Sequence, residues 1–503
     1  MMKNLFATFA WDLPAPGERL LLTTPAGESF SYADANRESA RIAHLLTGFG
    51  LKPGDRVTVQ APKSPQEVWL YLGCLRAGLV YHPLNDAYQA RELEFFINDA
   101  APSAVICDPA NEARFADLLA DRNCHLLTLD ETGAGSLAHA ARGQADTFNT
   151  VDCGAEATAV LLYSSGTTGT PKGAMLSHGN LAANTATLVD YWGFTDQDRL
   201  LHALPIYHAH GLFVGLGCAM TSGAAMIFLP RFDAREVIRR LPEATTMMGI
   251  PTFYTRLLAE PDFDKAACRS MRLFISGSAP LLASTHAQFS ARTGHAILER
   301  YGMTETSMLS SNPLDGERRA GTVGQPLPDV DIRVVDTAGQ SLPADSIGDI
   351  EVRGPNVFKG YWQLPEKTAA EFTSDGFFRT GDQGCFSEDG YLTIIGRNKD
   401  MVITGGLNVY PVEVELALNQ LDAVAESAVV GVPHADFGEG VIAVIVPAFG
   451  QEPAEADIIA ALREQLAGFK MPKRVFVVPE LPRNAMGKVQ KNELRQLFKG
   501  VFS

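Results

Sequence analysis

The stretch that decides the fold is Tyr163-Ser-Ser-Gly-Thr-Thr-Gly-Thr-Pro-Lys-Gly173, which directly follows the apolar run Ala159-Val-Leu-Leu162. Three glycines, five Ser and Thr hydroxyls and one lysine within eleven residues offer many N–H and O–H donors to phosphate oxygens. The loop is not a Walker A motif, because Lys172 follows a proline and no Ser or Thr comes after it. A Gly- and Ser-rich stretch alone is usually a linker. The strand before it and the Pro-Lys-Gly ending predict a phosphate-binding loop instead.

Short apolar runs alternate with helix-like stretches on both sides of this loop. Residues 56–60 and 104–107 have the composition of buried strands. Residues 65–79, 91–99 and 233–241 carry apolar side chains at helical spacing. Strands that alternate with helices predict an α/β fold with several layers and mostly parallel sheets.

The pattern changes in the second half of the chain. Residues 331–336 and 349–353 alternate polar and apolar side chains and are separated by turn residues, which predicts a small antiparallel β unit. A charged connector, Gly396-Arg-Asn-Lys-Asp400, follows it. We therefore predict a large N-terminal domain over residues 1–396 and a small α+β domain over residues 397–503.

The composition of the 503 residues excludes several classes of protein. Hydrophobic residues make up 46% and charged residues 20%, which is ordinary for a globular chain and rules out long disorder, collagen and coiled coil. The formal net charge of −16 argues against binding to nucleic acid or to an anionic membrane. The uncharged stretch 200–230 contains three histidines and four glycines, so we expect buried core rather than a membrane span. Seven scattered cysteines without a CxxC pair, and no signal or transit peptide pattern, favour the reducing cytoplasm.

Further motifs extend the signal of the phosphate loop along most of the chain, and their order resembles that of the adenylate-forming superfamily. This superfamily includes acyl-CoA synthetases, the adenylation domains of peptide synthetases, and firefly luciferase. The motifs are Lys52-Pro-Gly-Asp-Arg-Val57, Pro205-Ile-Tyr-His-Ala-His-Gly-Leu212, Ser276-Gly-Ser-Ala-Pro280, Tyr301-Gly-Met-Thr-Glu305, Gly376-Phe-Phe-Arg-Thr-Gly-Asp382, the 396–400 connector and Pro482-Arg-Asn-Ala-Met-Gly-Lys488. The resemblance implies a mobile C-terminal lid and two reactions. ATP and a carboxylate first give an acyl-adenylate and pyrophosphate, and a thiol then displaces AMP. ATP, Mg²⁺ and coenzyme A are the expected cofactors and co-substrates.

The resemblance also assigns roles to individual residues. Glu305 matches the Mg²⁺-binding glutamate, Thr304 contacts the α-phosphate, and Asp382 accepts hydrogen bonds from the ribose hydroxyls. Arg397 reaches the nucleotide. The phosphate loop contributes Ser164, Ser165, Gly166, Thr167, Thr168, Gly169, Thr170 and Lys172, and the adenine slot contributes Gly277, Ala279 and Tyr301. Outside the motif, Glu305 would be read as a surface charge and Asp382 as a turn cap.

Lys488 is the strongest single candidate for a catalytic residue. The matching lysine of the family bridges the carboxylate and the α-phosphate during adenylation, and a preorganised cation there is worth about 10²–10³-fold in rate. Lys488 must leave before the second reaction, and Lys399 matches the hinge about which the lid turns. The turn brings Gly405 and Gly406 to coenzyme A. Because acetylation removes the charge of a lysine, a protein acetyltransferase that modifies Lys488 is an expected regulatory partner.

The acid is indicated by Arg300, which precedes the Tyr-Gly-Met-Thr-Glu motif directly. Many relatives with apolar substrates carry an uncharged residue there, whereas this stretch resembles malonyl-CoA synthetases. We expect Arg300 to bind the distal carboxylate of malonate, or of methylmalonate, with His208 and Ser278 near the reacting end. The competing interpretation is that Arg300 pairs with Glu299 or another acid. Neighbours on a regular strand point to opposite faces, which disfavours Glu299.

Other functions remain open from the sequence. A short-chain, medium-chain or aryl acyl-CoA ligase would share all of these motifs, but Arg300 would not bind a second carboxylate in it. A stand-alone adenylation enzyme that loads a carrier protein, a luciferase-type oxygenase and a catalytically inactive nucleotide sensor are weaker alternatives. The presence of Lys172, Glu305, Asp382, Arg397 and Lys488 argues against the inactive sensor.

Overall fold

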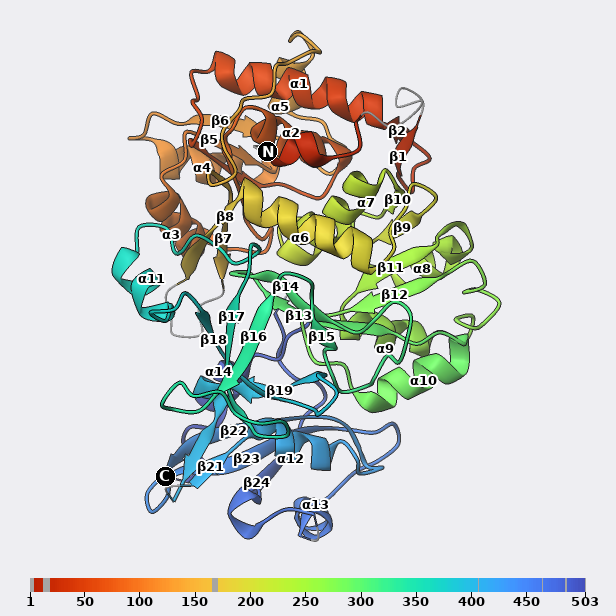
Figure 1. Ribbon diagram of the computed structural model, residues 1–503, viewed down its shortest axis with the longest axis vertical. Coiled ribbons are helices and arrows are strands. Elements are labelled where there is room, and N and C mark those ends of the chain that lie inside the picture. The colour runs from red at the N-terminus through yellow and green to blue at the C-terminus, as the bar shows by residue number, and fades with distance from the viewer. Residues whose placement is uncertain are drawn as a thin grey trace.

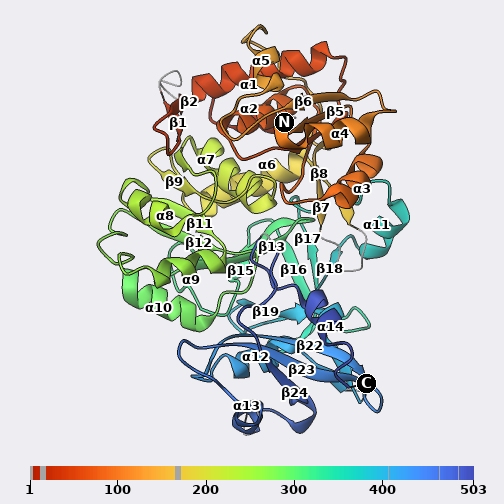
Figure 2. The same ribbon diagram turned by 180° about the vertical axis from the view of Figure 1, so that it is seen from behind.

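The computed structural model describes residues 4–11, 19–164, 171–405, 407–463, 465–484 and 486–502. Figures 1 and 2 show the N-terminal half at one end of an elongated molecule and the chain after about residue 400 at the other end. A four-stranded sheet, β16–β19, lies between them. The predicted α/β class is therefore confirmed, and the sheets are described from the N-terminal end downward.

A six-stranded sheet carries the phosphate loop. Its order is β6-β5-β3-β4-β7-β8, and all neighbours are parallel except β7 and β8. The strands are β3 (Arg56–Gln60), β4 (Val80–Pro83), β5 (Ala104–Cys107), β6 (His125–Thr128), β7 (Thr158–Ser164) and β8 (Lys172–Ser177). The helices of this region are α1 (Tyr32–Gly48), α2 (Pro65–Arg76), α3 (Ala90–Ala100), α4 (Glu112–Leu119) and α5 (Ser136–Ala141). The loop predicted at 163–173 thus joins two antiparallel neighbours.

A nine-stranded sheet forms the centre of the molecule, in the order β15-β14-β13-β12-β11-β9-β10-β1-β2. Its strands are β1 (Leu20–Thr23), β2 (Ser29–Ser31), β9 (Arg199–His202), β10 (Ala225–Phe228), β11 (Thr246–Gly249), β12 (Leu273–Ser276), β13 (Leu298–Met303), β14 (Ser307–Ser311) and β15 (Gln325–Pro326). Its helices are α6 (His178–Tyr191), α7 (Gly217–Ser222), α8 (Ala234–Arg240), α9 (Pro251–Ala259) and α10 (Ala283–Thr293). Residues 200–230 form β9, a π-helix (His210–Leu216), α7 and β10 within this layer, as expected of buried core.

The antiparallel unit predicted near residues 331–353 is a four-stranded sheet, β16-β17-β18-β19. The strands are β16 (Asp331–Val335), β17 (Gly348–Arg353), β18 (Phe378–Phe386) and β19 (Leu392–Arg397), with α11 (Pro365–Glu371) inserted before β18. β18 and β19 bring Asp382 and Arg397 opposite each other.

The chain after residue 400 forms a sheet of its own. It contains β20 (Val402–Thr404), β21 (Leu407–Val409), β22 (Val424–His434), β23 (Gly438–Pro447) and β24 (Arg474–Val477), with helices α12 (Pro411–Leu418), α13 (Glu455–Leu462) and α14 (Lys491–Phe498). Alternate residues of β22 and β23 belong to two separate apolar clusters, so each face of the sheet has its own core. The domain boundary at 396–397 stays a prediction, but this packing agrees with a unit that can move as a body.

Candidate active site

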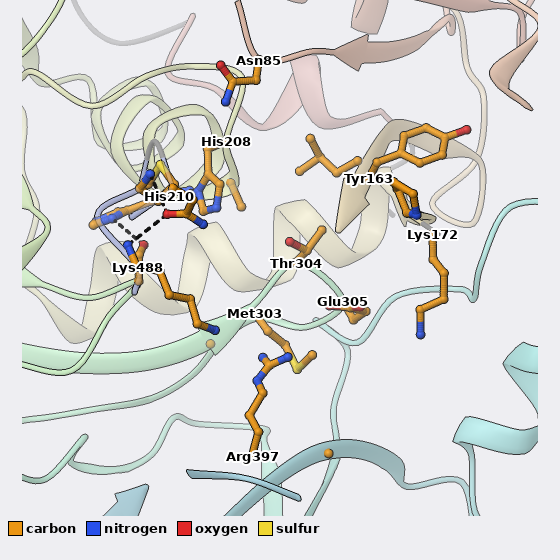
Figure 3. Close-up of a pocket in the computed structure, with 18 of the residues that line it drawn as sticks. Asn85, Tyr163, Lys172, His208, His210, Met303, Thr304, Glu305, Arg397 and Lys488 are labelled. Carbon is orange, nitrogen blue, oxygen red and sulfur yellow. Dashed lines mark hydrogen bonds between the residues drawn. The ribbon is translucent and has the colours of Figure 1, made fainter. Parts of the chain in front are cut away.

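A cavity of about 1000 Å³ gathers side chains from the six-stranded, nine-stranded and four-stranded sheets, and from the turn before α14 and the start of α14 in the last part of the chain. Its lining includes nine of the predicted site residues: Lys172, His208, Ser278, Arg300, Thr304, Glu305, Arg397, Lys399 and Lys488. Figure 3 shows Lys488, Arg397, Thr304 and Glu305 around one space, with Lys172 on one side and the two histidines His208 and His210 on the other. Residues more than 300 positions apart in the sequence therefore meet at one place.

Several predicted residues do not line this cavity or cannot be placed. Ser165, Gly166, Thr167, Thr168, Gly169, Thr170 and Gly406 lie outside the described residues, as does the side chain of Ser164. Gly277, Ala279, Tyr301, Asp382 and Gly405 are described but are not among the cavity-lining residues. Gly405 stands at φ +58° in the turn between β20 and β21, and its N–H donates to the carbonyl oxygen of Phe437. The prediction that this turn meets coenzyme A after a lid rotation is therefore untested.

Asp382 is held by two side chains at once. The hydroxyl of Tyr301 donates to Oδ2 at 2.5 Å, and Nε of Arg397 lies 2.8 Å from Oδ1. Asp382 is 3% exposed, and its carboxylate is the first cause of the raised pKa of Arg397. Each carboxylate oxygen can accept a second hydrogen bond, so the ribose contact predicted for Asp382 remains chemically open.

Glu305 is a buried carboxylate at the turn between β13 and β14. Its Oε1 accepts a hydrogen bond of 3.0 Å from the hydroxyl of Tyr361. Burial raises the pKa of Glu305, while the Tyr361 hydroxyl, Arg397 and Lys172 oppose the rise. Nζ of Lys172 lies 3.6 Å from the carboxylate of Glu371 and 4.4 Å from the centre of the Tyr361 ring.

The donor set around Glu305 fits Mg²⁺ bound through a substrate. No cluster of three or more His, Cys, Asp or Glu side chains that could hold a metal occurs in the described ranges. Mg²⁺ is commonly held by one or two carboxylates together with the phosphates of a nucleotide, rather than by a cage made of protein alone. A single carboxylate beside the phosphate loop is what such a site requires.

Arg300 is the most unusual group of the cavity. It is 4% exposed, and its Nε and Nη2 have no hydrogen-bond partner in the structure. Burial lowers the pKa of its guanidinium to about 9. A Cβ on Gly277 would lie 2.4 Å from Cζ of Arg300, so this glycine lets the guanidinium pack directly on the backbone of the β12 end. None of the ion pairs found within the described part of the chain involves Arg300, and the alternative pairing with Glu299 is not observed.

Two neutral histidines stand beside Arg300. Desolvation, assisted by the charge of Arg300, lowers the pKa of His208 to about 4 and also lowers that of His210. The backbone N–H of His210 donates to Nδ1 of His208 at 3.3 Å, so Nε2 of a neutral His208 must carry the proton. The hydroxyl oxygen of Ser278 lies 3.3 Å from Nδ1 of His210, within hydrogen-bond distance. The pocket therefore presents a cation and a hydrogen-bond donor to an acid.

Lys488 sits on a turn that docks against the N-terminal part of the chain. The Asn484 side chain accepts from the N–H of Lys488, and the Lys488 carbonyl accepts from the N–H of Asn484. Met486 is buried in the main apolar cluster, and Gly487, at φ +72°, lies against Thr252 of α9. Desolvation and the neighbouring Arg397 lower the pKa of Lys488.

Lys399 lies in the connector between β19 and β20. Burial and the cations Arg397, Lys488 and Arg495 lower its pKa to about 8, against the opposing effect of Asp400. Asp400 in turn is paired with Arg495 of α14 at 2.6 Å. The predicted hinge is thus surrounded by charged side chains.

Several residues of this site were not predicted from the sequence. His210 was part of a quoted motif, but its place beside Ser278 depends on the π-helix that starts there. Tyr361 carries no local signal, because it reaches Glu305 from a loop 56 residues further along the chain. Asn85, Tyr88 and Tyr207 also line the cavity.

Within the described ranges, we found no helix with the length and apolarity needed to cross a membrane.

Together, the phosphate-loop lysine, a buried carboxylate and a lid lysine around one cavity define an enzyme that acts on a nucleotide. The family model described as AMP-binding enzyme matches residues 10–362, and that of the AMP-binding enzyme C-terminal domain matches residues 413–488. The chain belongs to the AMP-binding enzyme family. The resemblance to the adenylate-forming superfamily, drawn from the motifs, is thereby confirmed.

Three relatives place the chain within this family. A malonate–CoA ligase of Arabidopsis thaliana is 34% identical, with 93% of this chain and 85% of that protein covered. A feruloyl-CoA synthase of an Amycolatopsis species is 36% identical, with 94% of both chains covered. The crystal structure of ATP-bound MatB from Rhodopseudomonas palustris is 54% identical over 100% of both chains, with a TM-score of 0.98.

The apo crystal structure of the same MatB superposes less closely, with a TM-score of 0.86 at 54% identity over 100% of both chains. Because the sequence match is the same, the difference must arise from the arrangement of the chain. The structure described here therefore has the arrangement of the ATP-bound relative.

Proposed function

We propose that this protein is an ATP-dependent malonate–CoA ligase that works through a malonyl-adenylate and releases AMP and pyrophosphate. The observation that carries the proposal is the buried guanidinium of Arg300, which lines the cavity and has two nitrogens without a partner. An anion that enters the pocket beside Arg300 would neutralise this buried guanidinium. The similarity to a protein named as a malonate–CoA ligase in Arabidopsis, and the near-complete superposition on MatB, support the same function.

In the first reaction, a carboxylate oxygen of malonate attacks the α-phosphorus of ATP and pyrophosphate leaves with the electrons of the broken P–O bond. Both reactants are anions, so charge neutralisation is the main task of the protein. Lys488, Arg397 and Lys172 line the cavity. Lys488 and Arg397 would supply cations at the α-phosphate, and Lys172 would supply one at the β- and γ-phosphates. Glu305 is the residue that would hold Mg²⁺, which neutralises phosphate charge when bound.

In the second reaction, the thiol sulfur of coenzyme A attacks the acyl carbon and AMP leaves. Lys488 lies in the cavity in the present arrangement, so the thiol needs a different approach. We propose that the lid, residues 397–503, turns about Lys399 and brings Gly405 and Gly406 toward the substrate. The use of two faces by one lid accounts for a connector placed between two independently packed sheets.

Arg300 also explains how the enzyme would reject simpler acids. Breaking a buried charge pair by removing one partner typically costs about 3–5 kcal/mol, whereas one methylene contributes only ~1–3 kcal/mol to selectivity. Acetate or propionate lacks the second carboxylate and would leave the guanidinium unpaired. Malonate and methylmalonate both carry it, and the geometry favours neither of them.

The test is ATP–pyrophosphate exchange without coenzyme A, measured with malonate, methylmalonate, succinate, acetate, butyrate, octanoate and benzoate. We expect exchange to be strongest with malonate or methylmalonate. In Arg300→Ala, exchange with malonate should fall at least about 100-fold, with no comparable loss for acetate. Arg235→Ala removes an arginine whose side chain is 86% exposed and serves as the matched control. Strongest exchange with a monocarboxylate would overturn the assignment of malonate.

A ligase for a short-chain, medium-chain or aryl acid is the second candidate. One relative that is about as similar to this chain as the malonate–CoA ligase is named for an aromatic acid, as a feruloyl-CoA synthase. A cation without a partner in the acyl pocket disfavours such an acid, because hydrocarbon would be placed against the charge. Another alternative is that a separate carrier protein replaces coenzyme A. Comparing the carrier thiol with the coenzyme A thiol as acceptors of the acyl group from preformed adenylate would distinguish the two.

Control by a protein acetyltransferase is a further part of the proposal. Lys488 lines the cavity in the present arrangement, so a modifying enzyme would reach it once the lid has turned. Acetylation would remove the cation and stop adenylation, while thioester formation from the preformed adenylate would continue. Full exchange activity with Lys488 stoichiometrically acetylated would refute this control.

We place the reaction in the reducing cytoplasm, with small molecules as its partners. The support is the spacing of the seven cysteines, of which the nearest two in the sequence, Cys107 and Cys124, are separated by a 3-10 helix (Pro109–Asn111) and by α4. Fractionation of cells that express the protein, followed by assay of malonate-dependent exchange, would test the location.

A further inference from the structure

The hydroxyl of Tyr361 ties the loop before α11 to the carboxylate of Glu305. The hydrogen bond from Tyr361 to Oε1 of Glu305 measures 3.0 Å, and both side chains are 4% exposed. The ring of the same tyrosine faces Nζ of Lys172 at 4.4 Å. One residue thus touches both the carboxylate and the lysine that border the phosphate end of the cavity.

Tyr361 itself is held firmly by the loop that carries it. We call residues 355–362 the strap. The strap pairs with β8, because the N–H of Met175 donates to the Gly360 carbonyl and the N–H of Trp362 donates to the Gly173 carbonyl. Ala174 and Tyr361 form an antiparallel bridge. The strap is therefore an extra strand segment beside the end of the phosphate loop.

The strap is also bonded to the turn that carries Glu305. The N–H of Phe358 donates to the Glu305 carbonyl at 2.8 Å, and the Asn356 side chain donates to the carbonyl oxygens of Thr306 and Met308. The rings of Phe358 and Tyr361 pack edge to face, with centroids 4.9 Å apart. Both partners of the Tyr361–Glu305 bond are consequently fixed to one rigid segment.

This arrangement restricts the rotation of a carboxylate in a place where rotation matters. An ionised carboxylate only accepts hydrogen bonds, and a donor fixed on one oxygen sets the direction of the other. A buried carboxylate without such a donor would have to be ordered when the nucleotide binds, which weakens binding. The hydroxyl of Tyr361 is this donor, although Tyr361 lies 56 residues after Glu305 in the sequence.

We propose that Tyr361 is a positioning residue that orients Glu305, beside Lys172, for the metal-bound phosphates of the nucleotide. The proposal rests on the function proposed above only in its use of a Mg²⁺–nucleotide, and it does not depend on which acid is the substrate. Tyr361 would act through Glu305 and make no contact with the acyl group.

The test uses Tyr361→Phe, which removes the hydroxyl and keeps the ring between Phe358 and Lys172. Calorimetric titration with a non-hydrolysable ATP analogue, at increasing Mg²⁺ and without acid, gives the affinity apart from any activity. We expect the Mg²⁺-dependent affinity to weaken about tenfold, because a hydrogen bond to a charged group is lost. In exchange assays, the Mg²⁺ requirement should rise by a similar factor, while the KM for the acid stays unchanged.

Two further variants make the result decisive. In Glu305→Gln, adding Tyr361→Phe should have little further effect on the Mg²⁺ dependence, because the two residues act through one bond. Tyr32→Phe removes another buried hydroxyl, bonded to the carbonyl oxygens of Ala219 and Ala224, and should leave both readouts unchanged. Unchanged Mg²⁺ dependence in Tyr361→Phe, or full additivity with Glu305→Gln, would overturn the proposal. Equal losses for acid and nucleotide together with a lower Tm would also overturn it, by pointing to a purely structural role.

The outcome separates this proposal from the assignment of malonate. If the wild-type enzyme exchanged pyrophosphate with another acid, the malonate assignment would fail while the calorimetric experiment on Tyr361 kept its meaning. If malonate were confirmed and Tyr361→Phe behaved like the Tyr32→Phe control, only the positioning role would fail.

Discussion

At the scale of single residues, the acyl pocket depends on side chains that are costly for the fold. Arg300 is buried without a carboxylate, and Ser278 adopts φ +70°, a left-handed conformation that favours glycine. Strain of this kind persists where the surrounding structure or a function requires the side chain. The hydroxyl of Ser278 reaches His210, which offers such a function in ordering the pocket.

The strain at Ser278 predicts an inverted order of stability for two substitutions at this position. Replacing alanine by glycine normally destabilises a protein by about 0.5–1 kcal/mol, because glycine has more freedom in the unfolded chain. At φ +70°, relief of strain outweighs this effect, so we expect Ser278→Gly to be more stable than Ser278→Ala by about 0.5–1 kcal/mol. Denaturant unfolding measures the difference. A less stable glycine variant would contradict the prediction.

Lys488 predicts a pH dependence with a definite sign. Its pKa is lowered below the ordinary lysine value, and only the protonated form is a cation. Pyrophosphate exchange should therefore fall as the pH rises through this lowered pKa. In Lys488→Arg the guanidinium stays protonated, so the residual rate should lose the alkaline decline over the same range. If the decline persisted unchanged in Lys488→Arg, another group such as Lys399, with a pKa of about 8, would control it.

At the scale of elements, the lid reaches the active site through one turn. Met486 enters the main apolar cluster, and Gly487 packs so closely that an added Cβ would lie 2.9 Å from Oγ1 of Thr252. The φ of +72° at Gly487 makes any side chain there unfavourable as well. The position of Lys488 in the cavity thus depends on a glycine next to it.

This docking predicts that Gly487→Ala separates the two reactions. Adenylation, measured by pyrophosphate exchange, should slow at least about tenfold, because the clash and the strain displace the turn that carries Lys488. Thioester formation from preformed malonyl-adenylate should be spared, because it uses another face of the lid. Gly468→Ala is the control, since an added Cβ meets nothing within 4 Å there. Equal slowing of both reactions would argue against the two-face scheme.

The elements show what the sequence alone could predict. The strands Arg56–Gln60 and Ala104–Cys107 were predicted with their observed bounds, because both are short runs rich in β-branched or apolar residues. The helix expected over 65–79 ends at Arg76, where the chain turns into β4. Nine of the site residues predicted from the motifs and their neighbours line one cavity in the structure. Tyr361 and the strap were missed, because pairing between distant segments leaves no periodic pattern in either of them.

At the scale of the whole molecule, the chain combines one continuous core with a smaller part that has its own. The main apolar cluster extends over the described chain from Leu5 to Leu392 and includes the lid only through Met486. The lid has two clusters of its own, one on each face of its sheet. Figures 1 and 2 show the lid below the four-stranded sheet from both sides.

The separate cores predict where the native protein is cut. Limited trypsin digestion should cleave first after Lys399, in the connector, and leave an N-terminal and a lid fragment that mass spectrometry identifies. ATP with malonate should slow this cleavage, because the substrates hold the lid in one arrangement. Lys399→Gln should slow the early cut and shift it to Arg397, whose side chain is paired with Asp382, whereas Lys367→Gln, on the exposed side of α11, should change neither its rate nor its position. First cleavage within residues 19–163 would contradict the predicted boundary.

The guanidinium of Arg300 rests on Gly277, where a Cβ would lie 2.4 Å from its central carbon. The arginine is therefore also a plug that fills the space above the end of β12. Shortening it would deepen the pocket and remove the charge in the same step. A relative that accepts a longer, uncharged acid could arise from such a protein through one substitution at this position, without any rearrangement of the sheet below.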